Sequence, residues 1–159
     1  MTILDIDISQ QGCQLFNGNK LLFEAAISTA LKGVGERKNS GCTPRGWHVI
    51  RACIGADKPE NTIFEGRRPT GEIYTAELGQ QFPQRDWILT RILWLSGIEL
   101  AKNRLGNVDT MQRYIYIHGC PDSLPMGEPL SHGCIRMHNK DLLTLFELVR
   151  PGTKVLIHE

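Results

Sequence analysis

The feature that most restricts the fold is a series of short runs in which apolar and polar residues alternate, a period that suits strands with one buried face. The first run alternates aliphatic residues with aspartates, in the order Leu4, Asp5, Ile6, Asp7 and Ile8. The dipeptide Asn17-Gly18 separates the runs 13–16 and 20–27, and Asn-Gly favours the tight turn of a β-hairpin. Many short strands joined by turns predict a mostly β fold, either a sandwich or a barrel.

Later segments extend this pattern. Residues 47–54 and 87–96 are predicted strands, and the second, as the most apolar run of the chain, is expected at the centre of a sheet. Residues 55–72 show no periodicity and are expected to be irregular, while 98–104 could form a short helix. The run 153–158 is predicted to be the last strand.

One clear helix is expected near the C-terminus, over about 139–149. Its apolar residues are spaced at i, i+3, i+4 and i+7, namely Leu142, Leu145, Phe146 and Val149. Asn139 suits the N-cap, Asp141 suits the first turn, and Pro151-Gly152 would end the helix.

Length, composition and charge exclude some classes of function but do not identify one. A length of 159 residues suits one domain over 1–159. A net charge of +1 provides no basic footprint for nucleic acid, and no stretch approaches the roughly 20 apolar residues of a membrane span. The first ten residues read as a strand and not as a secretion signal, and five cysteines, an odd number, suit a reducing compartment. A cytoplasmic location is therefore expected, and a periplasmic location is the alternative if a leader has been removed from the sequence.

Residues 114–139 hold the most informative chemistry. Ile115 and Ile117 would share one face of a strand, which leaves His118 on the opposite, open face. A loop rich in Pro and Gly follows, and the chain returns at a turn that contains Cys134. This arrangement could bring a His and a Cys that are distant in sequence into contact. A lone Cys or His is usually structural, so the whole string matters more than either residue.

The string is similar to the signature of the L,D-transpeptidase catalytic domain, the YkuD family. The resemblance rests on His118-Gly119, on Ser131-His132-Gly133-Cys134 and on Ile135-Arg136-Met137. Three upstream segments extend it, namely Ile27-Ser28, Thr43-Pro44 and Gly46-Trp47. The resemblance covers about residues 3–157 and implies a β-sandwich-like or barrel-like fold with a helix packed beside the turn at 131–134.

The resemblance implies a cysteine nucleophile, Cys134, with His118 as its base and the carbonyl of Gly119 orienting the imidazole. The pairing makes chemical sense because a thiolate attacks carbonyls and a neighbouring His can take the thiol proton. His132 and Gly133 belong to a turn whose backbone N–H groups could hold an oxyanion, since Gly permits conformations that other residues resist. We expect the His132 side chain to hold this turn, although contact with substrate is an alternative.

Several residues are candidates for substrate binding. Arg136 shares a face with Cys134 in an extended chain and could bind a substrate carboxylate, while Tyr116 shares the face of His118. Ser131 is a further candidate for substrate binding, because it lies within the motif. Arg67 and Arg68 could also bind a carboxylate through their guanidinium forks, although adjacent arginines are usually only exposed charge.

Two further possibilities are a disulfide that involves Cys120 and a zinc site. Cys120 could form a disulfide with Cys134 if their Cα atoms lie within about 7 Å. A zinc module is the rival class of function, because two Cys and two His ligands can be chosen from His118, Cys120, His132, Cys134 and His138. Single-residue spacing between paired ligands argues against this, since structural zinc motifs favour two to four residues. We expect no metal or other cofactor.

The family acts on peptides of the bacterial cell wall, so the resemblance implies tetrapeptides or muropeptides derived from peptidoglycan as partners. Members form a thioester at the third residue of the stem peptide and release the terminal D-Ala. Water as acceptor gives an L,D-carboxypeptidase, and an amine gives a cross-linking L,D-transpeptidase. The expected cytoplasmic location favours the carboxypeptidase, acting during cell-wall recycling, and leaves the transpeptidase as the alternative.

Overall fold

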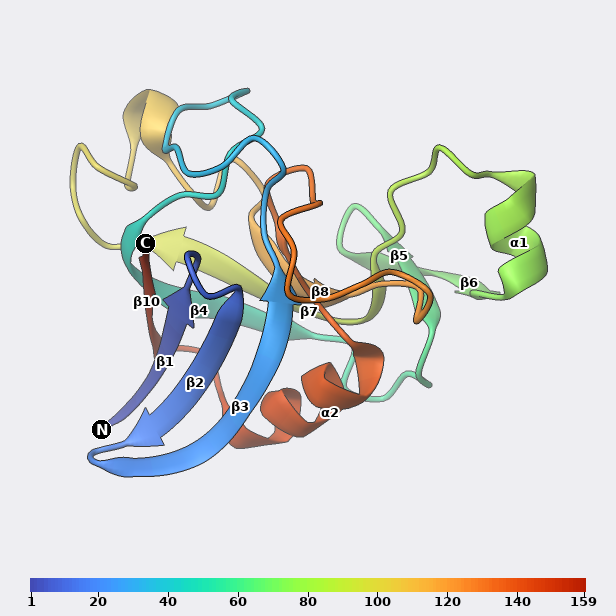
Figure 1. Cartoon of the computed structure of the whole chain (residues 1–159), viewed down its shortest axis with the longest axis horizontal. Helices are drawn as coiled ribbons and strands as arrows, with labels where there is room; N and C mark the ends of the chain where they lie inside the picture. The colour runs from blue at the N-terminus through green and yellow to red at the C-terminus, as the bar shows by residue number, and fades with distance from the viewer.

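Eight strands close into a barrel around one apolar core in the computed structural model, which describes residues 1–159 (Figure 1). The strands of the barrel are β1 (Thr2–Asp7), β2 (Gly12–Asn17), β3 (Lys20–Ser28), β4 (Gly46–Ile54), β7 (Leu89–Gly97), β8 (Tyr116–Gly119), β9 (Ile135–Met137) and β10 (Lys154–His158). Their order is β4-β10-β1-β2-β3-β9-β8-β7, and a pairing between β7 and β4 closes the barrel. The mostly β prediction is confirmed.

Apolar and polar residues alternate along the strands, so the apolar side chains fill the barrel. Leu4 and Ile6 on β1 are fully buried in the main core cluster, whereas Asp5 and Asp7 lie on the outer face. Ile115, just before β8, and Ile117, within β8, belong to the same core cluster. Each such strand buries every second side chain, and burial of one Leu or Ile stabilises the fold by roughly 1.5–3 kcal/mol.

Residues 55–72 were expected to be irregular, and this was wrong. They contain β5 (Thr62–Glu65) and the start of β6 (Arg68–Ile73), which form a hairpin beside the barrel. Gly66 and Arg67 form its turn with φ values of 54° and 64°. An unexpected short helix, α1 (Ala76–Gln81), follows, and both elements extend from the barrel on the side away from the termini (Figure 1). The hairpin was not predicted because all six residues of β6 are exposed, so apolar and polar residues do not alternate along it.

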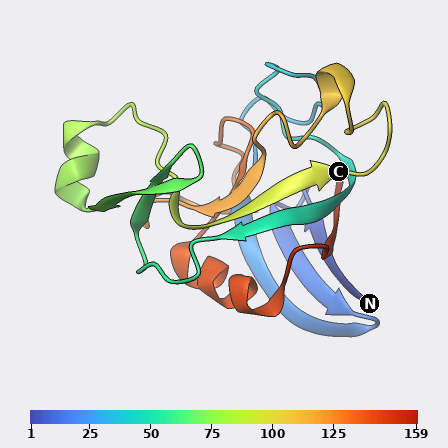
Figure 2. The ribbon, with the colours of Figure 1, turned by 180° about the vertical axis from the view of Figure 1, so that it is seen from behind.

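The expected C-terminal helix is α2 (Asn139–Leu148), which packs against β7 and β8 with Leu142 and Leu145 in the core (Figure 2). Its N-cap is His138 and not Asn139. Asn139 is instead the first helical residue, and its side chain is fully buried. Neither this helix nor α1 has the length and hydropathy to cross a membrane.

No helix forms over 98–104, where the chain makes turns. Leu100 is 71% exposed, so a helix here would have little apolar face to bury. Ala101 has a φ of 68°, which a right-handed helix excludes. The buried Asn103 fixes the turns instead, because its amide donates to the carbonyls of Arg45 and Trp47.

Candidate active site

Cys134 lies immediately before β9, at the end of a turn. The residue before it has a backbone conformation that only Gly adopts readily. Gly133 has a φ of 132°. The Cys134 thiol lies between two backbone groups of the neighbouring chain segment: the N–H of Tyr116 donates to Sγ at 3.3 Å, and Sγ donates to the carbonyl of Tyr114 at 3.3 Å. The sulfur therefore has a fixed position beside the start of β8.

Two buried hydroxyl groups hold this turn. Ser131 Oγ accepts from the N–H of Gly133 at 3.2 Å and donates to the carbonyl of Cys134. Thr43 Oγ1 donates to the carbonyl of Gly133 at 2.9 Å and accepts from the N–H of Ala30 at 3.0 Å. Ser131 is only 2% exposed, so the structure places it as a support of the turn and not as a substrate contact.

The free backbone donors of the turn agree only in part with those that the sequence indicated, which were His132 and Gly133. Gly133 N–H is occupied by Ser131, whereas the N–H groups of His132 and Cys134 donate to no protein acceptor. A free N–H beside a nucleophile can stabilise the oxyanion of a tetrahedral intermediate. The Cys134 and His132 N–H groups are therefore the available donors.

His118 lies on β8, which runs parallel to β9 and places His118 opposite Arg136. The same register puts Cys134 beside Tyr116, two positions before His118, and alternation puts Tyr116 and His118 on one face. The imidazole is 1% exposed, and its Nδ1 lies 2.6 Å from the carbonyl of Gly119. Since a carbonyl only accepts, Nδ1 carries the proton, and Nε2 of the neutral ring keeps a lone pair with no hydrogen-bond partner.

The two groups have shifted pKa values. Burial lowers the pKa of His118 below its ordinary value, so the ring is neutral at pH 7 and can accept a proton. Burial raises the pKa of the Cys134 thiol to about 12, against the opposing effects of the Tyr116 N–H and of Arg136 and Arg113. The thiol is thus protonated at neutral pH and needs a base to become a nucleophile.

A buried polar network behind His118 had no signal in the sequence. Asn139 Nδ2 donates to the carbonyl of Cys120 at 2.9 Å, and Asn139 Oδ1 accepts from Thr90 Oγ1 at 2.6 Å. A Cβ added at Gly119 would collide with Asn139 Oδ1 and with the carbonyl oxygen of Leu89. The His-Gly pair therefore requires Gly, because the network occupies the space of any side chain.

Gly119→Ala is expected to destabilise the protein by about 1–3 kcal/mol, since overpacking a close contact forces the backbone to shift. Thermal melts measure this change. Gly12→Ala is the matched control, because the nearest atom to its added Cβ, the carbonyl oxygen of Ala25, would lie 3.7 Å away. Equal melting temperatures for the two variants would contradict the role given to the network.

Asp86 is a second residue that the sequence did not indicate. It contacts side chains on both sides of Cys134, from His132 and from Arg136. Its Oδ1 lies 3.3 Å from Arg136 Nη2, and its Oδ2 lies 3.5 Å from His132 Nδ1. The three side chains line a cavity of about 660 Å³ together with Tyr74 and Trp87. Asp86 precedes β7 in a segment with no periodic pattern, so only the fold reveals its position.

The prediction that His132 holds the turn was wrong. Its side chain is 71% exposed and faces the cavity, where Asp86 is its partner. Arg136 is held more firmly: its side chain is 10% exposed, and Nη1 donates to the carbonyl of Leu130 at 3.3 Å.

On the other side of Cys134, Arg67 reaches from the β5–β6 turn. Its Nη1 donates to Tyr116 Oη at 3.0 Å, and its guanidinium lies over the rings of Trp94 and Tyr114 at 4.8 and 4.7 Å. Tyr116 is 5% exposed. Arg68 is exposed at the start of β6, and its side chain makes no hydrogen bond or ion pair, so the structure does not bring it to the site.

A disulfide between Cys120 and Cys134 does not fit the structure, in which both are free. Gly119 lies opposite Met137 and Ile117 opposite Ile135, so the two cysteines are offset by four positions along the paired strands. At ~3.3 Å per residue this separation is ~13 Å, about twice the limit for a disulfide. The zinc alternative also lacks support, since no three His, Cys, Asp or Glu side chains converge on a possible metal position.

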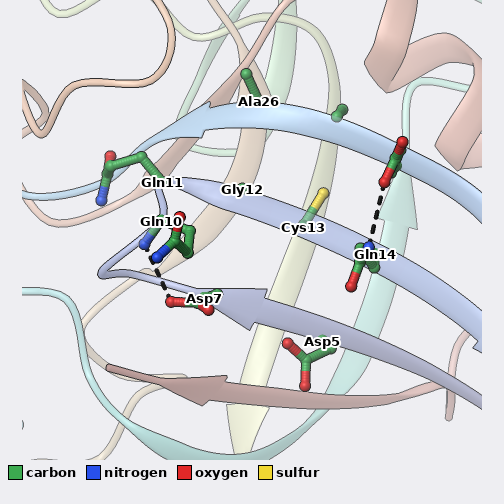
Figure 3. A pocket seen from close by; sticks show the side chains of 10 residues that line it. Asp5, Asp7, Gln10, Gln11, Gly12, Cys13, Gln14 and Ala26 are labelled. Carbon is green, nitrogen blue, oxygen red and sulfur yellow. Dashed lines mark hydrogen bonds between the residues drawn. The ribbon is translucent and has the colours of Figure 1, made fainter.

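A second cavity, of about 460 Å³, lies away from this chemistry on the outer face of β1–β3 (Figure 3). It is lined mainly by polar residues, including Asp5, Asp7 and Gln14, and none of the candidate site residues reaches it. Of these two cavities, only the one that His132 and Arg136 line contains candidate site residues.

Comparisons with known proteins point to one family. The family model of the YkuD L,D-transpeptidase catalytic domain matches residues 1–157. A putative L,D-transpeptidase, YkuD of Bacillus subtilis, is 37% identical over 90 residues, which are 57% of this chain and 44% of that protein. The aligned part thus spans less than half of this relative.

Solved structures show the same fold. An L,D-transpeptidase from Mycobacterium smegmatis superposes with a TM-score of 0.59 at 16% identity, covering 99% of this chain and 58% of the other. L,D-transpeptidase 3 from Mycobacterium tuberculosis, in complex with a faropenem-derived adduct, gives 0.57 at 16% identity, with 99% and 60% covered. With the barrel, the turn at 131–134 and the family match in agreement, this chain belongs to the YkuD L,D-transpeptidase catalytic domain family.

Proposed function

We propose that this protein is a cysteine acyl-transfer enzyme that acts on stem peptides of peptidoglycan, with Cys134 as nucleophile. The observation that carries the proposal is the state of His118: Gly119 fixes its Nδ1–H, which leaves an unpartnered Nε2 on the strand beside Cys134. Family membership supports the choice of peptidoglycan.

The proposed reaction begins when the thiol leaves the carbonyl of Tyr114 and transfers its proton to His118 Nε2. The sulfur attacks the peptide carbonyl carbon, and the oxyanion accepts from the free N–H of Cys134. Collapse of this intermediate breaks the peptide bond, and His118 returns the proton to the departing amine. The acyl group remains on Cys134 as a thioester.

We further propose water as the acyl acceptor, which makes the enzyme an L,D-carboxypeptidase that trims tetrapeptides. The exposed His132 beside the turn supports this, because solvent has access to the neighbourhood of the thioester. The family name favours the alternative, a transpeptidase with an amine acceptor. The cytoplasmic location expected from the sequence remains a prediction, which cell fractionation tests.

The test uses a defined tetrapeptide in water enriched in oxygen-18, with and without an added amine acceptor, and follows the products by mass spectrometry. We expect tripeptide that carries one heavy oxygen, together with free D-Ala. Cross-linked dimer as the main product would replace the carboxypeptidase by the transpeptidase. Absence of both products would contradict acyl transfer on this class of peptide.

A further inference from the structure

Behind the turn at 131–134 lies a half-buried cation, Arg113, that the proposed reaction does not use. Arg113 directly precedes Tyr114, whose carbonyl accepts from the Cys134 thiol, so its place in the chain is tied to the nucleophile. We infer that Arg113 is a positioning residue for acyl transfer: its guanidinium holds the segment behind the turn, and its charge stabilises the thiolate of Cys134.

Three acceptors of one segment hold the guanidinium of Arg113. Its Nη1 donates to the carbonyl of Gly35 at 3.1 Å. Its Nη2 donates to the carbonyl of Cys42 at 2.6 Å and to Ser40 Oγ at 3.3 Å. Because the N–H groups of a guanidinium form a rigid, planar fork, these contacts fix where the positive charge lies.

The same segment touches the turn that contains the nucleophile. Thr43 follows Cys42, and its Oγ1 donates to the carbonyl of Gly133 at 2.9 Å. The carbonyl oxygen of Cys42 would lie 3.5 Å from a Cβ added at Gly133. A single carbonyl group therefore separates the guanidinium of Arg113 from the residue that precedes Cys134.

The charge of Arg113 has no paired carboxylate to cancel it. Arg113 forms no ion pair, and Glu36, a carboxylate that raises its pKa, is itself bound by Arg45 through three hydrogen bonds. Burial lowers the pKa of Arg113, but a guanidinium stays protonated in a protein. The segment behind the turn therefore carries a positive charge at every pH at which the enzyme works.

Three charged side chains act on the thiol of Cys134. Asp86 raises the pKa of the thiol and Arg136 lowers it, and these two form an ion pair, so their effects oppose each other. Arg113 also lowers this pKa, and it has no such partner. The phenol of Tyr116, whose pKa is raised by burial, is neutral at pH 7. Arg113 is therefore the unpaired charge that favours the sulfur anion.

This charge acts in both halves of the proposed reaction. The sulfur becomes a thiolate when the thiol gives its proton to His118, and it leaves as a thiolate when the acyl group passes to the acceptor. A nearby cation stabilises the anion in each case. The inference rests on the proposed function only in taking Cys134 as the nucleophile.

The test measures the reactivity of Cys134 without a peptide substrate, so its result does not depend on whether acyl transfer to any peptide occurs. The background is His118→Ala, in which the thiol must ionise by itself. Alkylation of Cys134 by neutral iodoacetamide and by anionic iodoacetate is followed by peptide mapping between pH 7 and 9. A change in the shape of the turn affects both reagents alike, whereas loss of a nearby cation slows the anionic reagent more.

Three substitutions separate charge from shape. Arg113→Lys keeps the charge, Arg113→Gln keeps an N–H donor, and Arg113→Met keeps neither. We expect Arg113→Gln and Arg113→Met to react with iodoacetamide about tenfold more slowly, the effect of raising the thiol pKa by about one unit. Their ratio of iodoacetate rate to iodoacetamide rate should also fall. Arg113→Lys should keep that ratio and stay within about threefold in both rates.

Arg150→Met is the matched control, because Arg150 is an exposed arginine that lines a different cavity together with Met1 and Thr2. It should leave both rates unchanged, and Cys53 on β4 is the reference thiol within every sample. Thermal melts check the fold of each variant, and Arg113→Gln decides the test if Arg113→Met does not fold. Equal losses in Arg113→Lys and Arg113→Gln, an unchanged ratio of the two rates, or no loss in Arg113→Gln would overturn the inference.

Discussion

Replacing Cys134 with Ala is expected to reduce tripeptide formation to the background rate while the protein keeps its melting temperature within a few degrees. The substitution removes the only atom that can form the thioester. The turn depends on Ser131, Thr43 and Gly133, whose hydrogen bonds do not involve the sulfur. Mass spectrometry of the products and a thermal melt measure the two halves of this prediction.

Cys120→Ala is the matched control, because it removes a thiol from the same region. Cys120 is fully buried, and its sulfur lies 3.9 Å from the carbonyl of Met137, away from the turn. This variant should retain activity within about tenfold of the original protein. Loss of activity in Cys120→Ala with retention in Cys134→Ala would transfer the nucleophile to the other cysteine.

His118→Ala should lower the rate of acylation by roughly 10²–10⁴, the usual contribution of a positioned general base. Its pH profile should also change. With His118 present, the pKa of the ring lies below its ordinary value, so the neutral base is available at pH 7 and activity falls only as the pH drops through that lowered pKa.

Without His118 the thiol must ionise by itself. Its pKa of about 12 means that the thiolate fraction rises about tenfold for each pH unit up to that value. A plot of log rate against pH between 6.5 and 9 should therefore be nearly flat for the original protein and rise with a slope of one for His118→Ala. A flat profile for the variant, or a rate within tenfold of the original, would exclude His118 as the base.

His158→Ala is the control for this experiment. His158 lies on β10 and pairs with Asp5 on the outer face of the barrel, so it belongs to no part of the site. Its rate should stay within about twofold of the original at every pH.

The fold could be predicted where one physical pattern acts on a whole element. Leu4 and Ile6 alternate with aspartates because one face of β1 lines the core, and Leu142 and Leu145 recur because one side of α2 packs on it. The β5–β6 hairpin offered no such pattern. It contacts the barrel through few residues, such as Ile63, while β6 stays exposed.

The site residues also fall into those that a local sequence pattern indicates and those that it does not. Cys134, His118 and Gly119 were indicated because they lie in one short string. Asp86, Thr43 and Asn139 act through contacts with residues 19–90 positions away in the sequence, and only the closed barrel brings them there. Asn139 also fits the description of a helix cap, which hid its role as the centre of a buried network.

Isolation of the acyl-enzyme tests the central claim most directly. The protein is mixed with tetrapeptide, quenched in acid at short times and measured by intact-mass spectrometry, followed by peptide mapping. We predict a species heavier by the tetrapeptide minus its terminal D-Ala, attached to Cys134 and released by hydroxylamine as expected of a thioester. Tripeptide that accumulates with no such species at any time, or an acyl group mapped to another residue, would contradict the account.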